Sequence, residues 1–171
     1  MLAEARDFFL RRFLVPQQTR QLFKYASLPA RAARLALGDP ASALLAVRMA
    51  TWVVVLSLLV RVMPLPRALG LVAPKGLGRR SDDAARVQAR IARLLDSLLA
   101  ADFWVFTPIC WKRASVLHRY LALRGIETRI LFGVRREGDD ALSGHAWLET
   151  EGQPLLETTP PDYKVTYSFP S

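Results

Sequence analysis

The sequence contains few of the residues that build metal sites and covalent cross-links. Among its 171 residues there are one cysteine and two histidines. A single cysteine cannot form a disulfide within the chain, and these ligands are too few for a zinc site. We therefore expect no metal and no cofactor. We also expect a cytoplasmic protein, because disulfides belong to oxidising compartments.

Acidic residues are scarce in the first half of the chain. Residues 1–80 contain 13 Lys and Arg against three Asp and Glu, whereas residues 81–171 contain 11 against 12. The net charge of +9 therefore belongs to the N-terminal half, which would face any anionic partner, such as a membrane leaflet. The sequence has no zinc-finger spacing, no ribonucleoprotein aromatic motif and no Gly-rich phosphate loop, so we expect no nucleic-acid partner.

The one long apolar segment is interrupted by charge. A helix is predicted over 40–63, with Asp39 as its N-cap and Pro40 in its first turn. Its uncharged stretch, between Arg48 and Arg61, has twelve residues, fewer than the roughly 20 that a spanning helix needs. We expect this helix to be buried or to lie on a membrane surface. Peripheral attachment to the inner face of the membrane is therefore a second expected location. The alternative is a spanning helix that takes Arg48 into the membrane.

Composition divides the chain into three parts. The Gly-rich, basic segment "APKGLGRR" at 73–80 predicts a linker. Ser81 is expected to cap the next helix, which runs through "DDAARVQARIARLLDSLLA". We therefore divide the chain into a basic helical N-terminal region (1–72), the linker and a core (81–171).

A further helix is predicted to begin just after Pro108 and to end at Gly125. Its apolar face repeats at steps of four, three and four residues: Cys110, Ala114, Leu117 and Leu121. This spacing places Cys110 in the first turn of the helix, on its inner face.

Alternating apolar residues predict strands after this helix. The stretches are "IETRILFGV", "HAWLE", "QPLLET" and "YKVTYSF", and the polar segment "RREGDDALSG" is expected to be a turn after the first. A helix followed by an antiparallel meander is typical of an α+β fold.

The position predicted for Cys110 has chemical consequences. Unpaired N–H groups and the dipole at a helix start lower the pKa of a thiol and favour the thiolate nucleophile. The same N–H groups can bind the oxyanion that forms when a carbonyl is attacked. The alternative is that Cys110 is simply a small buried residue.

Two histidines could serve Cys110 as a base. His118 lies eight residues along the same helix, which is roughly 12 Å at the helical rise and too far for a hydrogen bond. We expect His118 to lie on the helix surface. His145 is therefore the candidate base.

The hairpin after His145 predicts its partner. A two-residue loop would force Glu151 into a positive φ, so we expect a three-residue loop, Thr150–Gly152. In that register His145 faces Glu157, with Cβ atoms about 5 Å apart. Glu157 would then orient the imidazole, His145 would take the thiol proton and Cys110 would attack. The alternative is an exposed ion pair on a sheet.

These segments resemble a known family. "PICWKRASVLHRYLALRGIETRILFGV" followed by "GHAWLE" resembles the transglutaminase-like cysteine peptidases that remove leader peptides in lasso peptide biosynthesis. The resemblance implies a transglutaminase-like (papain-like) core, with the catalytic Cys at a helix start packed on an antiparallel sheet. It implies a Cys–His–Asp triad, which this chain would build from Cys110, His145 and Glu157. Glutamate departs from that pattern, so Asp162 is the reserve third member.

The resemblance also implies partners. These are a precursor peptide made of leader and core, a winged-helix-like leader-recognition protein, an ATP-dependent macrocyclase and an exporter at the membrane. Residues 1–40 are too few and too helical in pattern to be the recognition domain, so we expect it to be a separate protein. The basic N-terminal helices could dock onto any of these partners or onto an anionic membrane.

Other residues and other functions stay open at this stage. Trp111 and Trp147 flank the predicted site and could line a substrate groove or belong to the core. Arg113 could bind a substrate carboxylate or pair with Glu149. The alternative functions are a non-catalytic or membrane-associated adaptor with the same fold, and an acyl or amide transferase that uses the same thioester.

Overall fold

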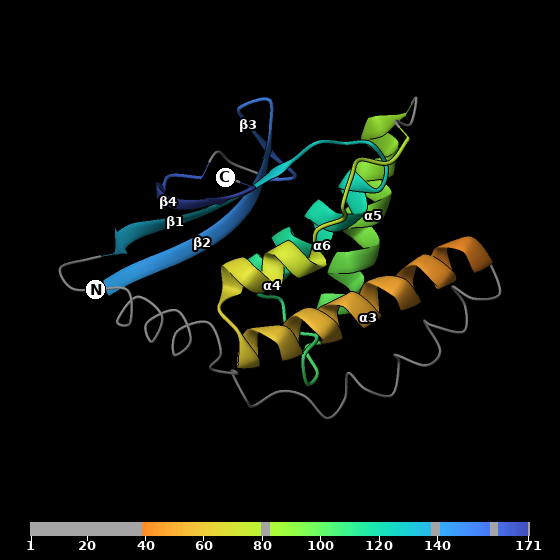
Figure 1. The fold of residues 1–171 in the computed structure, drawn as a ribbon, viewed down its shortest axis with the longest axis horizontal. Coiled ribbons are helices and arrows are strands. Elements are labelled where there is room, and N and C mark those ends of the chain that lie inside the picture. Colours follow the sequence, from red (N-terminus) through yellow and green to blue (C-terminus); the bar gives the residue numbers. More distant parts are fainter. Residues whose placement is uncertain (1–38, 80–82, 138–140, 158–160, 171) are drawn as a thin grey trace.

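The computed structural model describes residues 39–79, 83–137, 141–157 and 161–170, which form helices followed by one antiparallel sheet (Figure 1). The helices are α3 (Pro40–Val62), α4 (Leu65–Val72), α5 (Ala84–Leu99) and α6 (Cys110–Ala122). The strands are β1 (Arg129–Glu137), β2 (Ala141–Thr150), β3 (Gln153–Leu155) and β4 (Lys164–Phe169). The strand order is β3-β2-β1-β4. The predicted α+β class is confirmed.

Helix α6 is the centre of the packing. It contacts α3, α4 and α5 on one side and the strands β1 and β2 on the other. Its sequence explains this position, because ten of its thirteen residues are buried, and a helix that is covered all round belongs in a core. The residue that begins α6, Cys110, is therefore held between the helical layer and the sheet.

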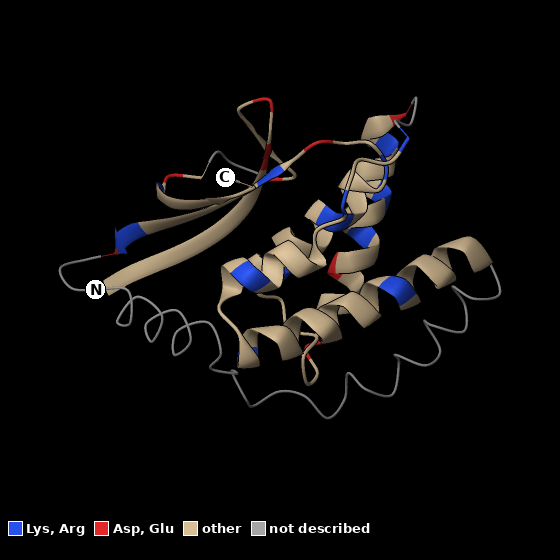
Figure 2. Cartoon of the chain, viewed as in Figure 1, with Lys and Arg blue, Asp and Glu red and all other residues tan. Residues whose placement is uncertain are grey.

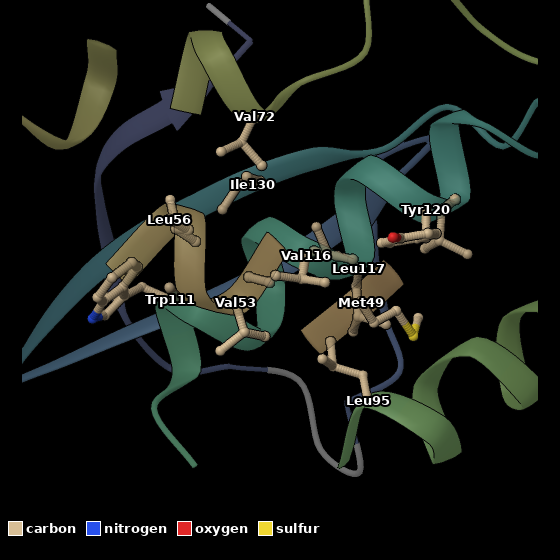
Figure 3. Close-up of a cluster of buried hydrophobic side chains, with 14 of the residues drawn as sticks. Met49, Val53, Leu56, Val72, Leu95, Trp111, Val116, Leu117, Tyr120 and Ile130 are labelled. Atoms are coloured by element: carbon tan, nitrogen blue, oxygen red, sulfur yellow. The ribbon is translucent and has the colours of Figure 1, made fainter. Parts of the chain in front are cut away.

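The long helix α3 packs on the same core. Met49 and Val53 are fully buried and approach Leu95 of α5 and Leu117 of α6 (Figure 3). The division of the chain at 73–80 stays a prediction, but the helices before that segment and the unit after it share one hydrophobic core. A core of this kind ties the position of α3 to that of α6.

Capping explains where the helices begin. Asp39 accepts the backbone N–H of Ser42 at 3.0 Å, and Pro40 occupies the first turn, which confirms the predicted start of α3. The cap of α5 differs from the prediction. Asp83 caps this helix by accepting the N–H of Arg86 at 3.2 Å, whereas Ser81 lies outside the described residues. The acid one turn before the apolar repeat is thus the capping residue.

Two predictions about the sheet are wrong. The predicted turn 135–144 is largely strand, because β1 continues to Glu137 and β2 begins at Ala141. The loop between β2 and β3 has two residues, since Thr150 pairs with Gln153. Glu151 and Gly152 both take positive φ, 50° and 78°. Two left-handed residues in sequence match the twist of a tight hairpin, and this preference outweighs the cost of that conformation at a glutamate.

Candidate active site

Cys110 is the first residue of α6, and nothing caps that helix. The N-cap is Ile109, whose side chain makes no capping hydrogen bond. The first hydrogen bond of the helical ladder runs from the N–H of Arg113 to the carbonyl of Ile109, so the N–H groups before Arg113 have no partner in that ladder. An apolar N-cap therefore leaves backbone donors around the Cys110 sulfur, where an oxyanion would form.

The Cys110 thiol is more basic than the sequence predicted. Burial raises the pKa of the half-buried thiol above its ordinary value. The N–H groups of Ala146, Trp111 and Cys110 itself lower the pKa, and the charge of Glu157 raises it. The predicted lowering by the helix start is present but smaller than the effect of burial, so the prediction of a low thiol pKa is wrong. Cys110 is therefore held as a thiol, and it would need a base to become a nucleophile.

The protonated state of the Cys110 thiol predicts how it reacts with iodoacetamide. Because the thiol pKa is raised, the protonated form persists to higher pH, and the midpoint of the alkylation profile should lie above that of the same chain unfolded in urea. The chain has only one cysteine, so mass spectrometry of the whole protein measures the reaction without interference. A native midpoint below the unfolded one would contradict this description of the site.

Glu157 lies beside His145, as the sequence predicted. The distance from His145 Nε2 to Glu157 Oε2 is 3.5 Å. The register behind that prediction is wrong, because β3 ends at Leu155, which pairs with Leu148 and not with Trp147. Leu156 takes a φ of 61°, which turns the chain out of the strand and returns Glu157 to the histidine. The contact therefore comes from a left-handed residue after the strand and not from strand pairing.

The contact with Glu157 indicates which ring nitrogen of His145 carries the proton and which can accept one. A carboxylate that faces Nε2 favours the tautomer with its proton on that atom, which leaves Nδ1 as the proton acceptor. The separation of 3.5 Å exceeds the usual hydrogen-bond range. Catalytic hydrogen bonds are often long without substrate and shorten in the complex.

Aromatic rings fix the plane of His145. The imidazole stacks on Trp147, with ring centroids 5.9 Å apart and planes at 14°. It also contacts the tilted ring of Tyr163, with centroids 5.3 Å apart and planes at 35°. Gly133 is the strand partner of His145. A Cβ there would lie 2.7 Å from the Tyr163 Cβ and 3.0 Å from the Trp147 ring. The "FGV" motif was the signal for this glycine in the sequence, whereas nothing in the sequence singled out Tyr163.

Arg113 connects Glu157 to helix α5. It binds Asp96 in a fork, with Nε to Oδ1 at 2.7 Å and Nη2 to Oδ2 at 3.2 Å. Its Nη1 lies 3.8 Å from Glu157 Oε1. The predicted pairing of Arg113 with Glu149 is wrong, because the fold brings Asp96 and Glu157 to this arginine. Arg113 thus adds positive charge beside the acid that faces His145.

One pocket brings these groups together. It has a volume of about 460 Å³ and is lined by residues from α5, the start of α6, β2 and the segment after β3: Asp96, Leu99, Ala100, Pro108, Ile109, Cys110, Arg113, His145, Ala146, Leu156 and Glu157. Trp111 and Trp147 do not line it, because each is 4% exposed and packed in the interior. Asp162 does not line it either. That residue is exposed, and its charge acts on Arg135.

A buried lysine holds the segment before Cys110. Lys112 donates from Nζ to the carbonyl of Val105 at 2.9 Å and to Thr107 Oγ1 at 3.1 Å. Burial, and then the charge of Arg61, lower its pKa to about 8. Nothing in the sequence indicated this role, since a lysine two residues after the cysteine looks like a surface residue. Lys112 therefore positions the backbone that leads into the pocket.

His118 is not on the surface, which corrects the prediction. It is 7% exposed, and its Nδ1 lies 2.9 Å from Thr128 Oγ1. Burial lowers its pKa, and a hydrogen bond with the backbone of Thr128 acts against that shift. His118 belongs to the core between α6 and the sheet. Among the residues that the structure describes, no group of three His, Cys, Asp or Glu is placed to hold a metal ion.

Comparison with known proteins gives one result. The family model described as the transglutaminase-like superfamily matches residues 50–168, which is more than half of the chain. The match begins within α3 and extends into β4, so it includes Cys110, His145 and Glu157. No curated protein and no solved structure matches the chain.

Proposed function

The chain belongs to the transglutaminase-like superfamily, and on that premise we propose that it is a cysteine peptidase that removes the leader peptide from a lasso peptide precursor. One observation carries the proposal: a single pocket is lined by Cys110 at a helix start, His145 and Glu157. These groups can supply the nucleophile, the base and the acid that orients the base. The motif around Cys110 and His145 supports the choice of substrate.

The first chemical step transfers a proton and forms a tetrahedral intermediate bonded to Cys110. His145 Nδ1 takes the thiol proton as Cys110 Sγ attacks the carbonyl carbon at the leader–core junction. Glu157 stabilises the imidazolium that results. The raised pKa of the thiol means that this transfer accompanies attack and does not precede it. The N–H groups at the start of α6 are placed to bind the negative oxygen of the tetrahedral intermediate.

The second step releases both products. The C–N bond breaks, which leaves the leader bound to Cys110 as a thioester, and the imidazolium gives its proton to the departing amine of the core peptide. Water then attacks the thioester, with His145 as the base, and leaves the leader with a free carboxylate. Transfer to an amine would use the same thioester, so the acceptor distinguishes a peptidase from a transferase.

Cleavage in ¹⁸O-labelled water tests this assignment. The purified protein would be mixed with the precursor and the recognition protein from the same gene neighbourhood, and the products would be weighed by mass spectrometry. Hydrolysis places one labelled oxygen in the leader carboxylate. An amide on the leader, formed with an added amine and without label, would instead establish a transferase.

The proposed partners follow from the resemblance to the leader peptidases of lasso peptide biosynthesis. The leader would be presented by a separate winged-helix-like recognition protein, and the released core would pass to an ATP-dependent macrocyclase. An exporter at the membrane would remove the product. The peptidase would therefore act in the cytoplasm or at the inner face of the membrane.

Glu157→Gln tests the orienting acid. The amide keeps the shape but loses the charge that stabilises the imidazolium, so the rate of cleavage should fall roughly 100-fold. The free energy of unfolding should change by about 1 kcal/mol or less, because Arg113 keeps its fork with Asp96. Cleavage by the purified variant and its thermal unfolding measure the two effects.

Two matched variants accompany this test. Asp162→Asn removes an exposed carboxylate outside the pocket and should cleave like the parent. Glu157→Asp shortens the side chain that already lies 3.5 Å from His145, and it should keep more activity than the Gln variant because the charge remains. If Glu157→Gln cleaved at the parental rate while Asp162→Asn were inactive, the third triad member would be Asp162.

A further inference from the structure

The outward side of α3 is apolar over most of its length, with the exposed Arg48 at its edge. We call this side the outer stripe; its residues recur at steps of three or four: Leu44, Val47, Thr51, Val55, Leu58 and Val62. Four of them are large and exposed, with Val47 at 62% and Val62 at 79%. The hydroxyl of Thr51 donates to the carbonyl of Val47 at 3.0 Å, so the one polar side chain of the stripe is already partnered within the helix.

Two exposed aromatic residues lie near the C-terminal end of the stripe. Phe103 and Trp104 are 53% and 61% exposed. We call them the aromatic tip; they belong to the loop between α5 and α6, which runs beside α3 (Figure 1). Arg61 near the end of α3 acts on the pKa of Lys112, whose ammonium binds the carbonyl of Val105. The tip and the end of α3 are therefore neighbours.

The backbone holds the aromatic tip outward. Phe103 and Phe106 exchange two backbone hydrogen bonds, at 3.2 and 2.8 Å, which closes the loop. Asp102 and Trp104 take positive φ, 49° and 52°, which is costly for residues other than glycine. Val105, the next residue, is buried in the core. The loop thus anchors one side chain inside and presents Phe103 and Trp104 to solvent.

The charge on α3, α4 and the segment that follows them is positive. Residues 40–79 contain no Asp or Glu and five basic residues: Arg48, Arg61, Arg67, Lys75 and Arg79. Figure 2 shows blue but no red on α3 and α4. Asp102, next to the tip, is partly exposed. Two copies that met through the outer stripe would bring the basic residues Arg48 and Arg61 of each α3 together, whereas an anionic lipid surface would attract them.

We propose that the outer stripe and the aromatic tip form a docking surface for an anionic lipid bilayer, with α3 lying in the plane of the interface. The leucine and valine side chains of the outer stripe enter the boundary between the lipid headgroups and the acyl chains. Trp104 lies at the level of the headgroups, and the flanking arginines bind lipid phosphates. The length and apolar character of α3 would also suit a helix that crosses a membrane. Crossing would remove Met49, Val53 and Leu56 from the core that they share with α5 and α6.

Sedimentation with vesicles tests the proposal on the full chain. Vesicles with about 30% phosphatidylglycerol in phosphatidylcholine should bind the protein in about 0.1 M NaCl, and vesicles of phosphatidylcholine alone should bind at least about tenfold less. Leu58→Glu and Trp104→Ser should each lower binding to the anionic vesicles by about tenfold or more. Leu142→Glu is the matched control, because Leu142 on β2 is 43% exposed against 46% for Leu58, and it should bind like the parent.

Other results would overturn the proposal. Equal binding by Leu58→Glu and the parent would show that another part of the chain holds the membrane. Attachment that survives both about 1 M NaCl and alkaline carbonate would indicate a spanning helix. A parent dimer that Leu58→Glu converts to monomers, without vesicle binding, would make the surface a contact between copies. None of these readouts depends on peptidase activity, so the docking surface and the proposed function can fail separately.

Discussion

Cys110→Ala is expected to abolish cleavage of the precursor while the protein stays folded. Alanine cannot form the thioester, and loss of a nucleophile lowers rates by about 10⁴- to 10⁶-fold in enzymes with this chemistry. The thiol is half-buried at the start of α6 and removing one sulfur atom should lower the melting temperature by less than about 5 °C. Product formation followed by mass spectrometry and thermal unfolding by circular dichroism measure both effects.

The Cys110→Ala protein also separates the peptidase from the adaptor. An adaptor would keep its biological effect when Cys110 is replaced, because only its surface would matter. Cleavage at the parental rate by the purified variant would eliminate the cysteine mechanism, and the pocket would then need another nucleophile.

His145→Gln should lower the cleavage rate by about 10⁴-fold. Glutamine has a similar length but no nitrogen that can take the thiol proton, and the Cys110 thiol has a raised pKa, so the variant lacks the thiolate at neutral pH. Raising the pH should recover part of the lost activity, because hydroxide then removes the proton that His145 would take. The pH profile of cleavage is the measurement.

The other histidine is the control for this variant. His118 is buried and bound to Thr128 outside the pocket. His118→Gln is expected to lower the free energy of unfolding by about 1 to 3 kcal/mol and to keep the cleavage rate of the protein that remains folded. If His118→Gln lost activity without losing stability and His145→Gln kept it, the assignment of the base would be reversed.

The parts of the site that depend on local sequence were predicted correctly. Asp39 with Pro40, and Pro108 with Gly125, are short-range signals, and they located the helices α3 and α6. Helical spacing then placed Cys110 in the first turn of an apolar face. Such features follow from a few neighbouring residues, so they do not depend on how the rest of the chain packs.

The route to the contact between His145 and Glu157 could not be read from the sequence. The hairpin register depends on whether Glu151 accepts a positive φ, and the two-residue loop shows that it does. That register alone would put Glu157 on the wrong side of the strand. The left-handed conformation of Leu156 returns Glu157 to the side of His145. A leucine in the sequence does not predict such a conformation. The prediction reached the right pair of residues through the wrong geometry.

The burial of Cys110 and His118 was the other property that the sequence did not predict. The thiol pKa was expected to be low because a helix start is a local feature, whereas the desolvation that raises it comes from α5, β2 and the segment after β3. His118 was expected on the helix surface, but the segment just before β1 supplies Thr128 as its partner. Both errors come from neglecting surfaces contributed by distant segments.

The reaction of Cys110 with a substrate-like inhibitor tests the central claim most directly. A chloromethyl ketone built on the last residues of the leader should modify the protein once, on the only cysteine of the chain. The fraction of protein modified, measured by mass spectrometry, should equal the fraction of cleavage activity lost. Full modification of Cys110 with cleavage unchanged would contradict the claim that this pocket is the active site of a cysteine peptidase.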